Sequence, residues 1–239
     1  MILKIQQQSA EWLSERTGRI TASRVKDVMS RLKNGAPSEK RSKYLMEIVC
    51  ERLTGMAAEH YVTPAMDWGS ENEKHARAAY EVESGNEVDK VGMAVHPSID
   101  CLSASPDGAI GDKGLWEGKC PTTAKHLEWM MDGEVPEEHR DQCLTQLACW
   151  EREWLDFTSY DPRLPEGLQV FTKRLERDDK RIAAIEFAVI EFDAEVNDKI
   201  DRLKGKNPFH EKLRKAAAVD AAMYITEDDL PQWAREMRS

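Results

Sequence analysis

The sequence predicts an α/β or α+β fold in which helices flank a mixed central β-sheet. Three observations indicate this fold class. Apolar residues recur at helical spacing from Trp12 to Tyr80, short strand-like segments follow between Val88 and Lys119, and helices and strands then alternate to Leu203. The chain has 239 residues, of which 41% are hydrophobic, so we expect a single domain over residues 1–239.

Helices are predicted before residue 85 wherever a capping residue precedes apolar positions at helical spacing. They span about residues 10–17, 22–32, 38–53 and 63–83. Thr21 is the expected N-cap of the second helix. Gly55 and Gly85 are expected to end the third and the fourth.

Strands are predicted where the chain turns frequently at Pro, Gly and Asp. An antiparallel meander is expected over residues 88–96, 102–105 and 115–119. Two helices (about 123–131 and 137–150) and two strands (155–160 and 168–175) follow. A long amphipathic helix is expected over about 179–203, and a charged helical tail over 208–239 with a fresh start at Thr226.

Composition excludes several classes of protein. No apolar stretch is long enough for a transmembrane helix, and residues 1–9 lack the pattern of a signal peptide, so we expect a cytoplasmic protein without a membrane partner. The five cysteines contain no C-x-x-C pair and are expected to be buried free thiols: Cys50, Cys101, Cys120, Cys143 and Cys149. The net charge of −10, taken alone, argues against a nucleic-acid partner.

The most informative segment runs from Asp107 to Lys119. Residues two apart in a strand share a face, so Glu117 and Lys119 are expected to project together, and a tight turn can bring Asp107 beside them. Neighbouring carboxylates repel unless a cation joins them, and oxygen ligands, including the Gly118 carbonyl, favour Mg²⁺. An ammonium group beside such an ion can orient a water molecule, which suits phosphodiester hydrolysis. A solvated strand face is the alternative interpretation.

Glu73 is a further candidate carboxylate. It shares a helix face with Ala76 and Tyr80, so it can point towards the sheet. An exposed acidic residue on a helix surface is the alternative.

The chain resembles the YqaJ family of λ-exonuclease-type viral recombination nucleases, which belong to the PD-(D/E)xK superfamily. The resemblance runs from about Trp12 to Leu203 and rests on four motifs: Trp68-Gly69 with Glu73, Ser105-Pro106-Asp107-Gly108, Glu117-x-Lys119-Cys120-Pro121 and Tyr160-Asp161-Pro162. It implies a restriction-endonuclease-like core and an Mg²⁺-dependent 5′→3′ exonuclease, with Mn²⁺ as a substitute ion. The substrate would be linear double-stranded DNA with 5′-phosphorylated ends, and the product would carry 3′ single-strand overhangs.

The resemblance also implies an assembly and a setting. It implies a ring-shaped homotrimer and a single-strand annealing protein as partner, in a bacterial cell that carries a phage-type protein. It further implies an N-terminal helical part that binds the 5′ end (about 9–55), a catalytic core (about 63–175) and C-terminal helices (about 179–239).

Site residues are carried over by position. Asp107, Glu117 and the Gly118 carbonyl would be metal ligands, and Glu73 would complete a second metal position or hold a water molecule. Lys119 would activate the attacking water, and Gln142 would help to position that water or Lys119. The glycine at position 118 replaces the bulky apolar residue of the family and is expected to make the strand more flexible.

The resemblance also implies a site for the end of the substrate. Arg16, Ser23 and Thr21 match the segment that binds the 5′-phosphate, a role that suits the forked guanidinium group. Met66 occupies the position of the residue that separates the strands. A closed ring needs positive charge only along its channel, and the basic clusters at residues 16–24, 31–43 and 173–174 are expected to supply it.

Other functions remain open on the sequence. A restriction-type endonuclease or an iron–sulfur nuclease uses the same core, although the cysteine spacing here does not suit a cluster. A catalytically idle DNA-binding module would not need the carboxylate–lysine set. A glycoside hydrolase with paired carboxylates is disfavoured by Lys119.

Overall fold

The computed structural model describes residues 1–58 and 63–205. Residues 1–196 form one compact unit, and the fold below is that of this unit. The predicted tail helix over 208–239, with its start at Thr226, lies outside the described residues.

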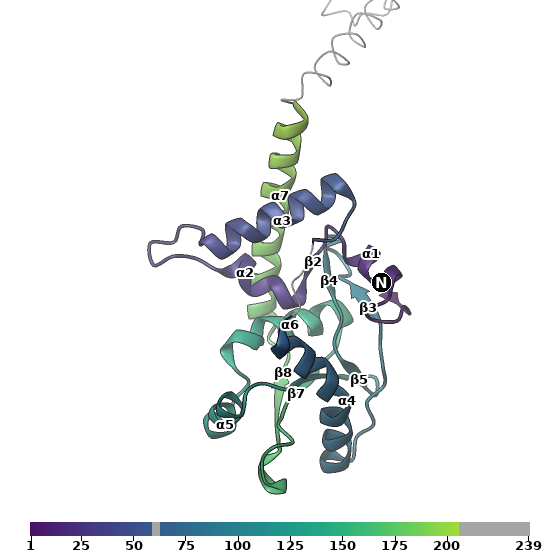
Figure 1. Cartoon of the computed structure of the whole chain (residues 1–239). Coiled ribbons are helices and arrows are strands. Elements are labelled where there is room, and N and C mark those ends of the chain that lie inside the picture. The colour runs from purple at the N-terminus through teal and green to yellow at the C-terminus, as the bar shows by residue number, and fades with distance from the viewer. Residues whose placement is uncertain (59–62, 206–239) are drawn as a thin grey trace, which may run out of the picture. The chain divides into compact units, whose positions relative to one another are not determined.

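The helices mostly lie where the sequence predicts them (Figure 1). Side-chain oxygens of Ser9, Ser38 and Thr63 accept hydrogen bonds from backbone N–H groups in the first turns of α1, α3 and α4. Gly55 and Gly85 end α3 and α4 in the left-handed conformation, as predicted. The α-helices are α1 (Ala10–Arg16), α2 (Val25–Met29), α3 (Glu39–Thr54), α4 (Pro64–Ser84), α5 (Thr123–Asp132), α6 (Glu137–Trp150) and α7 (Asp179–Gly205), with short 3₁₀ turns η1 (Ala22–Arg24) and η2 (Glu166–Leu168).

The second helix differs from its prediction. Thr21 makes no capping hydrogen bond and belongs to a short strand, β2 (Ile20–Thr21), which pairs in parallel with β4. The helical segment begins as the 3₁₀ turn η1 and ends at Met29 rather than at Leu32. Strand pairing therefore fixes the backbone of Thr21 in the extended form that a helix cap would also need.

The described strands form two mixed four-stranded sheets. The first has the order β1-β3-β4-β2 and the second β5-β6-β7-β8, with β2–β4 and β6–β7 as the parallel pairs. The predicted mixed α/β class is confirmed, but the expected meander is divided: its first two strands lie in the first sheet and its last strand in the second. The strands not yet bounded are β1 (Ile2–Leu3), β3 (Met93–Val95), β4 (Leu102–Ala104), β5 (Gly108–Ile110), β6 (Gly114–Lys119), β7 (Trp154–Tyr160) and β8 (Val170–Glu176).

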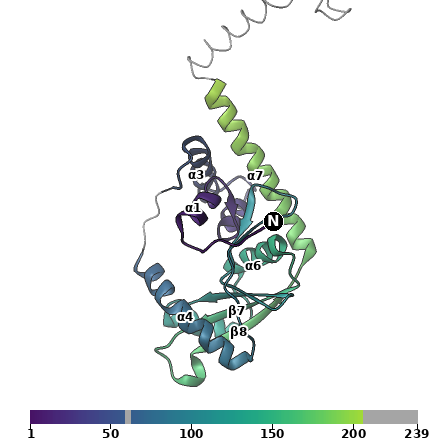
Figure 2. The ribbon, with the colours of Figure 1, turned by 90° about the vertical axis from the view of Figure 1, so that its right-hand side faces the viewer.

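Helices cover both faces of the second sheet. Figure 2 shows α6 on one side of β7 and β8 and α4 on the other. Helix α6 also contacts β3 and β4, so it lies between the two sheets. Because alternate residues of β6 point in opposite directions, its odd-numbered side chains face α6 and its even-numbered ones face α4.

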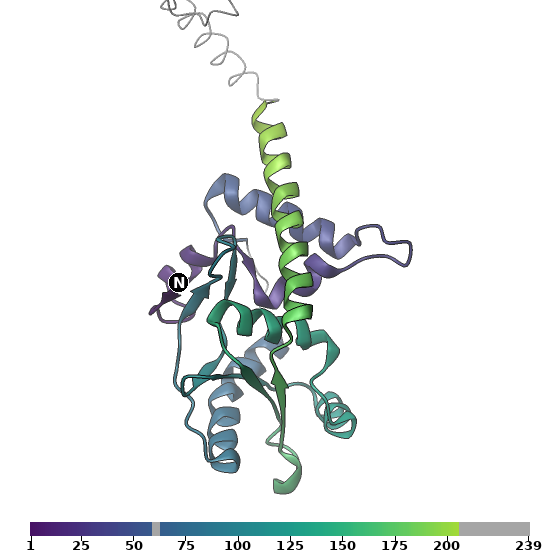
Figure 3. The ribbon, with the colours of Figure 1, turned by 180° about the vertical axis from the view of Figure 1, so that it is seen from behind.

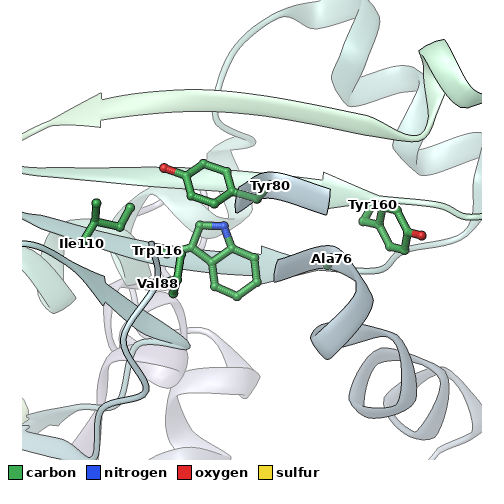
Figure 4. Close-up of a cluster of buried hydrophobic side chains, with 6 residues drawn as sticks. All are labelled: Ala76, Tyr80, Val88, Ile110, Trp116 and Tyr160. Atoms are coloured by element: carbon green, nitrogen blue, oxygen red, sulfur yellow. The ribbon is translucent and has the colours of Figure 1, made fainter. Parts of the chain in front are cut away.

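Trp116 fills the space between β6 and α4. It is fully buried, its ring lies 6.0 Å from that of Tyr80, and its indole N–H donates to Thr158 Oγ1 at 2.9 Å. Figure 4 shows this cluster, with Tyr80 and Trp116 side by side. A Cβ at position 118 would lie 2.4 Å from the Trp116 ring, so Gly118 makes room for that ring.

The long helix α7 packs against α3 (Figure 3). The Tyr44 and Phe192 rings stack at 5.5 Å, and the buried guanidinium group of Arg41 makes two hydrogen bonds to Glu195 at 2.6 and 2.8 Å. None of the described helices combines the length and apolar character needed to cross a bilayer.

The five cysteines are free thiols, as predicted, but only two of them are buried. Cys143 and Cys149 point into the core from α6, whereas Cys50 is exposed and Cys101 and Cys120 are half-buried.

Candidate active site

The chain brings Asp107, Glu117 and Lys119 together at one end of β6. Asp107 directly precedes β5, which pairs with β6 so that Gly108 lies opposite Trp116. The N–H of Gly118 donates to Asp107 Oδ2 at 2.9 Å. Lys119 Nζ donates to Glu117 Oε1, and at 3.2 Å to the Gly118 carbonyl. Two carboxylates, an ammonium group and a backbone carbonyl therefore converge within a few residues of one strand.

The Glu117 carboxylate is buried and surrounded by donors. Its side chain is 2% exposed, and besides Lys119 it accepts from Gln142 Nε2 at 2.5 Å and from Gln146 Nε2 at 2.6 Å. Both glutamines lie on the face of α6 that packs on β6. A buried charge needs such partners, since an unpaired carboxylate in the interior is strongly destabilising.

Gln146 was not among the residues selected from the sequence. Its four-residue spacing from Gln142 puts both amides on one helix face, a signal that sequence reasoning could have used. Gln146 Oε1 is also buried without a hydrogen-bond partner, so the amide leaves an unsatisfied acceptor beside Glu117.

The surroundings shift the proton affinities of the central groups. Burial, followed by the charge of Glu117, raises the pKa of Asp107 well above its ordinary value. Burial alone would lower the pKa of Lys119, but the charges of Glu117 and Asp107 outweigh it and raise that pKa. Lys119 is therefore a cation at neutral pH and donates hydrogen bonds to Glu117 and to the Gly118 carbonyl.

Glu73 faces the same region from α4. It lines a cavity of about 770 Å³ together with Asp107. Removal from water, only partly offset by the charge of Lys119, raises the pKa of Glu73. Within the described residues no three carboxylate, histidine or cysteine side chains lie close enough to hold one metal ion, so Glu73 does not join Asp107 and Glu117 around a single position.

Two side chains from the N-terminal segment hold the loop that carries Asp107. Gln7 Nε2 donates to the Pro106 carbonyl at 2.8 Å and to the Val91 carbonyl at 3.0 Å. The indole N–H of Trp12 donates to Ser105 Oγ at 3.0 Å. The position of Asp107 therefore depends on residues about a hundred positions earlier in the chain.

The residues predicted to bind the 5′-phosphate lie near Tyr44. Arg16 stacks on the Trp12 ring at 4.1 Å, and burial, opposed by the charge of Tyr44, lowers its pKa. Thr21 donates its N–H to the Tyr44 hydroxyl at 3.3 Å, and its own hydroxyl lies 3.3 Å from that of Ser23. Within the described residues, Arg16 makes no ion pair. Met66 is 52% exposed in the first turn of α4.

Several basic side chains of the clusters singled out in the sequence pair with carboxylates. Arg24 pairs with Asp27 and Glu47, and Arg174 with Asp156, at 2.6–2.9 Å. Ion pairs likewise engage Arg19, Arg41, Lys43 and Lys173. These side chains are less available for DNA phosphates than their spacing in the sequence suggests.

A family model of the YqaJ-like viral recombinase domain matches residues 11–158. The chain belongs to the YqaJ-like viral recombinase family. This family member is 44% identical to an alkaline exonuclease from Laribacter hongkongensis, LHK-Exo, with a TM-score of 0.76; the match covers 88% of this chain and 100% of LHK-Exo. The same enzyme in complex with dAMP gives a TM-score of 0.77.

A more distant solved structure shares the fold. A phage-related exonuclease from Haemophilus somnus is 14% identical, with a TM-score of 0.61 over 77% of this chain and 96% of its own. No curated protein matches the chain.

Proposed function

We propose that this family member is a metal-dependent exonuclease that hydrolyses linear double-stranded DNA from 5′-phosphorylated ends and leaves 3′ single-strand overhangs. The observation that carries the proposal is the convergence of Asp107, Glu117 and Lys119 around Gly118, whose N–H donates to Asp107 and whose carbonyl accepts from Lys119. The similarity to LHK-Exo over its whole length supports nuclease chemistry.

The residues at the end of β6 fit a hard divalent cation. Asp107, Glu117 and the Gly118 carbonyl offer only oxygen donors, which Mg²⁺ prefers and Mn²⁺ also accepts. Glu73, across the cavity, would hold a second ion or a water molecule. When bound, the cation supplies Lewis-acid stabilisation of the charge that develops on the phosphate oxygens.

Side chains of this chain would position the attacking water and the metal-binding carboxylates. Lys119 carries a positive charge beside Glu117, from where it can donate a hydrogen bond to the attacking water and stabilise negative charge in the transition state. Gln142 and Gln146 hold the Glu117 carboxylate in one orientation. Gln7 and Trp12 fix the loop that carries Asp107.

The substrate end would bind through the N-terminal segment. Arg16 has no ion pair within the described residues, so its guanidinium group can make a forked contact to a terminal phosphate, with Thr21 and Ser23 hydroxyls nearby. Met66, exposed at the start of α4, would separate the strands. We further propose a single nuclease domain over residues 1–239, a ring-shaped homotrimer, a single-strand annealing partner and a bacterial cytoplasmic location.

Linear duplex DNA labelled at either 5′ or 3′ ends, incubated with and without Mg²⁺, tests the reaction class, the polarity and the metal need together. We expect early release of the 5′ label with Mg²⁺ only, and no attack on covalently closed circular DNA. Cleavage of the circle would indicate an endonuclease. Binding without cleavage in either Mg²⁺ or Mn²⁺ would indicate a catalytically idle module.

A further inference from the structure

The cavity that Asp107 and Glu73 line is also lined by more basic than acidic side chains. Four basic side chains line it: Lys4, Lys74, Arg77 and Lys90. The same walls carry two carboxylates, Asp107 and Glu73, both of them candidate catalytic groups. The cavity is therefore electropositive in a chain whose net charge is −10.

None of these four cations forms an ion pair or a side-chain hydrogen bond within the described residues. Arg24, Arg41 and Arg174, by contrast, each pair with carboxylates. Arg77 and Lys90 act on Glu73 only as neighbouring charges that partly counteract the rise in its pKa. Uncompensated positive charge around a cavity attracts anions more strongly than neutralised pairs do.

The four residues come from three separate segments that the fold brings together. Lys4 follows β1, Lys74 and Arg77 lie one turn apart on α4, and Lys90 precedes β3. A Cβ at Gly92 would lie 2.2 Å from the Leu3 carbonyl, so the glycine allows the N-terminal segment with Lys4 to lie directly against the chain that follows Lys90. At about 770 Å³, the cavity has the size of a ligand site.

We propose that Lys4, Lys74, Arg77 and Lys90 bind phosphate groups of the DNA strand that enters the active site. The inference rests on the proposed function and adds to it the contacts that hold the strand beside Asp107. Phosphates are the anions that a nuclease must hold within reach of its carboxylates, and lysine and arginine bind them as charges. A released nucleoside monophosphate presents the same group, so the experiment must separate the two sources.

The test is a salt titration of duplex binding. A triple variant, Lys4→Gln/Lys74→Gln/Lys90→Gln, changes only exposed side chains and is expected to fold. Affinity for a 5′-phosphorylated duplex is measured by fluorescence anisotropy over a salt series without divalent cations. Since each lost phosphate contact lowers the slope of log K against log salt by about 0.7–0.9, the triple variant should lose about 2 from that slope. For Arg77→Gln alone, the magnitude of the same slope should fall by about 0.7–0.9.

A matched control removes three exposed lysines of α7, outside the predicted basic clusters, that have no ion pair within the described residues: Lys180→Gln/Lys199→Gln/Lys204→Gln. It should keep the wild-type slope. With Mg²⁺, kcat/KM for linear duplex should fall in the cavity variant and not in the control. An unchanged slope in the cavity variant, or an equal loss in both triple variants, overturns the inference.

Two further outcomes are distinguishable. If added deoxynucleoside monophosphate inhibits the wild type but not the cavity variant, while their DNA salt slopes agree, the cavity binds the product and the inference about the strand is wrong. If the wild-type protein neither binds nor cleaves DNA, the proposed function itself fails.

Discussion

At the scale of single residues, Glu117 is the point on which the candidate site converges. One ammonium group and two amides donate to its two oxygens, so its orientation is fixed before any ion or substrate arrives. Such preorganisation is what electrostatic catalysis requires, because no reorganisation is then needed during the reaction.

Lys119→Ala is expected to abolish cleavage, with a fall in kcat of about 10²–10³-fold or more, because it removes the cation beside Glu117. Duplex binding should survive. Single-turnover cleavage and anisotropy on the same preparation measure both. Lys125→Ala, whose partner is Glu138, is the matched control and should cleave normally. Wild-type cleavage by the Lys119 variant would contradict the assignment.

Arg16→Ala should reduce the preference for 5′-phosphorylated ends, because no forked contact to the terminal phosphate then remains. The measurement compares initial rates on 5′-phosphate and 5′-hydroxyl duplexes for both proteins. Equal rates of the wild type on the two duplexes would rule out the 5′-phosphate pocket.

The buried side chain of His139 is expected to make the stability of the fold depend on pH. Burial between Trp129 and Phe157, reinforced by the charge of Lys119, lowers the pKa of His139 to about 4. The unfolded chain takes up this proton near pH 6.5 and the folded chain only near pH 4. Neutral His139 therefore makes its full contribution to the free energy of unfolding above pH 6.5. That contribution, up to about 3 kcal/mol, is lost as pH falls towards 4.

Urea unfolding at pH 7 and pH 4.5 measures this loss. His139→Phe keeps an aromatic ring in place and should weaken the pH dependence, whereas His75→Gln, at an exposed position of α4, should not. The same pH dependence in His139→Phe as in the wild type would show that other groups cause it.

The residues of the candidate site were predictable to different degrees. Alternation in a strand and a short turn were enough to place Asp107, Glu117 and Lys119 together. Gln146 was missed although its four-residue spacing from Gln142 puts the two amides on one helix face. Some ion pairs of the basic clusters, such as Arg24 with Asp27, have the three-residue spacing that a helix pattern can show. Others join residues far apart in the chain, as Arg41 and Glu195 do, and no local pattern shows them.

At the scale of elements, the packing of β6 against α4 explains the glycine in the catalytic strand. The Trp116 ring occupies the volume that a side chain at position 118 would need. The large side chain on this face of the strand is therefore at position 116, and position 118, between Glu117 and Lys119, carries none.

Gly118→Ala should therefore destabilise the fold by about 1–3 kcal/mol through overpacking against Trp116. Urea unfolding at neutral pH measures the change in the free energy of unfolding. Gly167→Ala is the control, since a Cβ there meets no atom within 4 Å. An unchanged midpoint for Gly118→Ala would mean that the Trp116 ring moves aside freely.

Long elements were predicted well because caps and periodicity both indicate them, as for α3 and α4. The strands β1, β2 and β5 were missed because two or three residues carry no measurable alternation. The division into two sheets was also missed. A Pro-Asp-Gly turn looks the same whether the chain returns to the same sheet, as in a hairpin, or enters another one, as it does after β4.

At the scale of the whole molecule, an acidic chain is proposed to act on an acidic polymer. Neutralised basic clusters and an electropositive cavity resolve this conflict, since attraction is needed only where the strand is cut. An enzyme that encircles its substrate can retain it without strong binding elsewhere.

The ring prediction has a direct test. Sedimentation of the full chain at neutral pH should give a mass about three times the 27.3 kDa of one chain. The control is a dilution series, in which a specific trimer keeps its mass until it dissociates cooperatively. A monomer mass at every concentration would contradict the ring.

The place of β6 in its sheet has a last consequence. Because residues 114–116 of this strand are paired with β5 on one side and with β7 on the other, their amides are shielded from solvent. In heavy water the N–H groups of Leu115 and Trp116 should be among the slowest in the chain to exchange, opening only with global unfolding. The strand that carries the candidate catalytic carboxylate of Glu117 would then stay closed for as long as the chain remains folded.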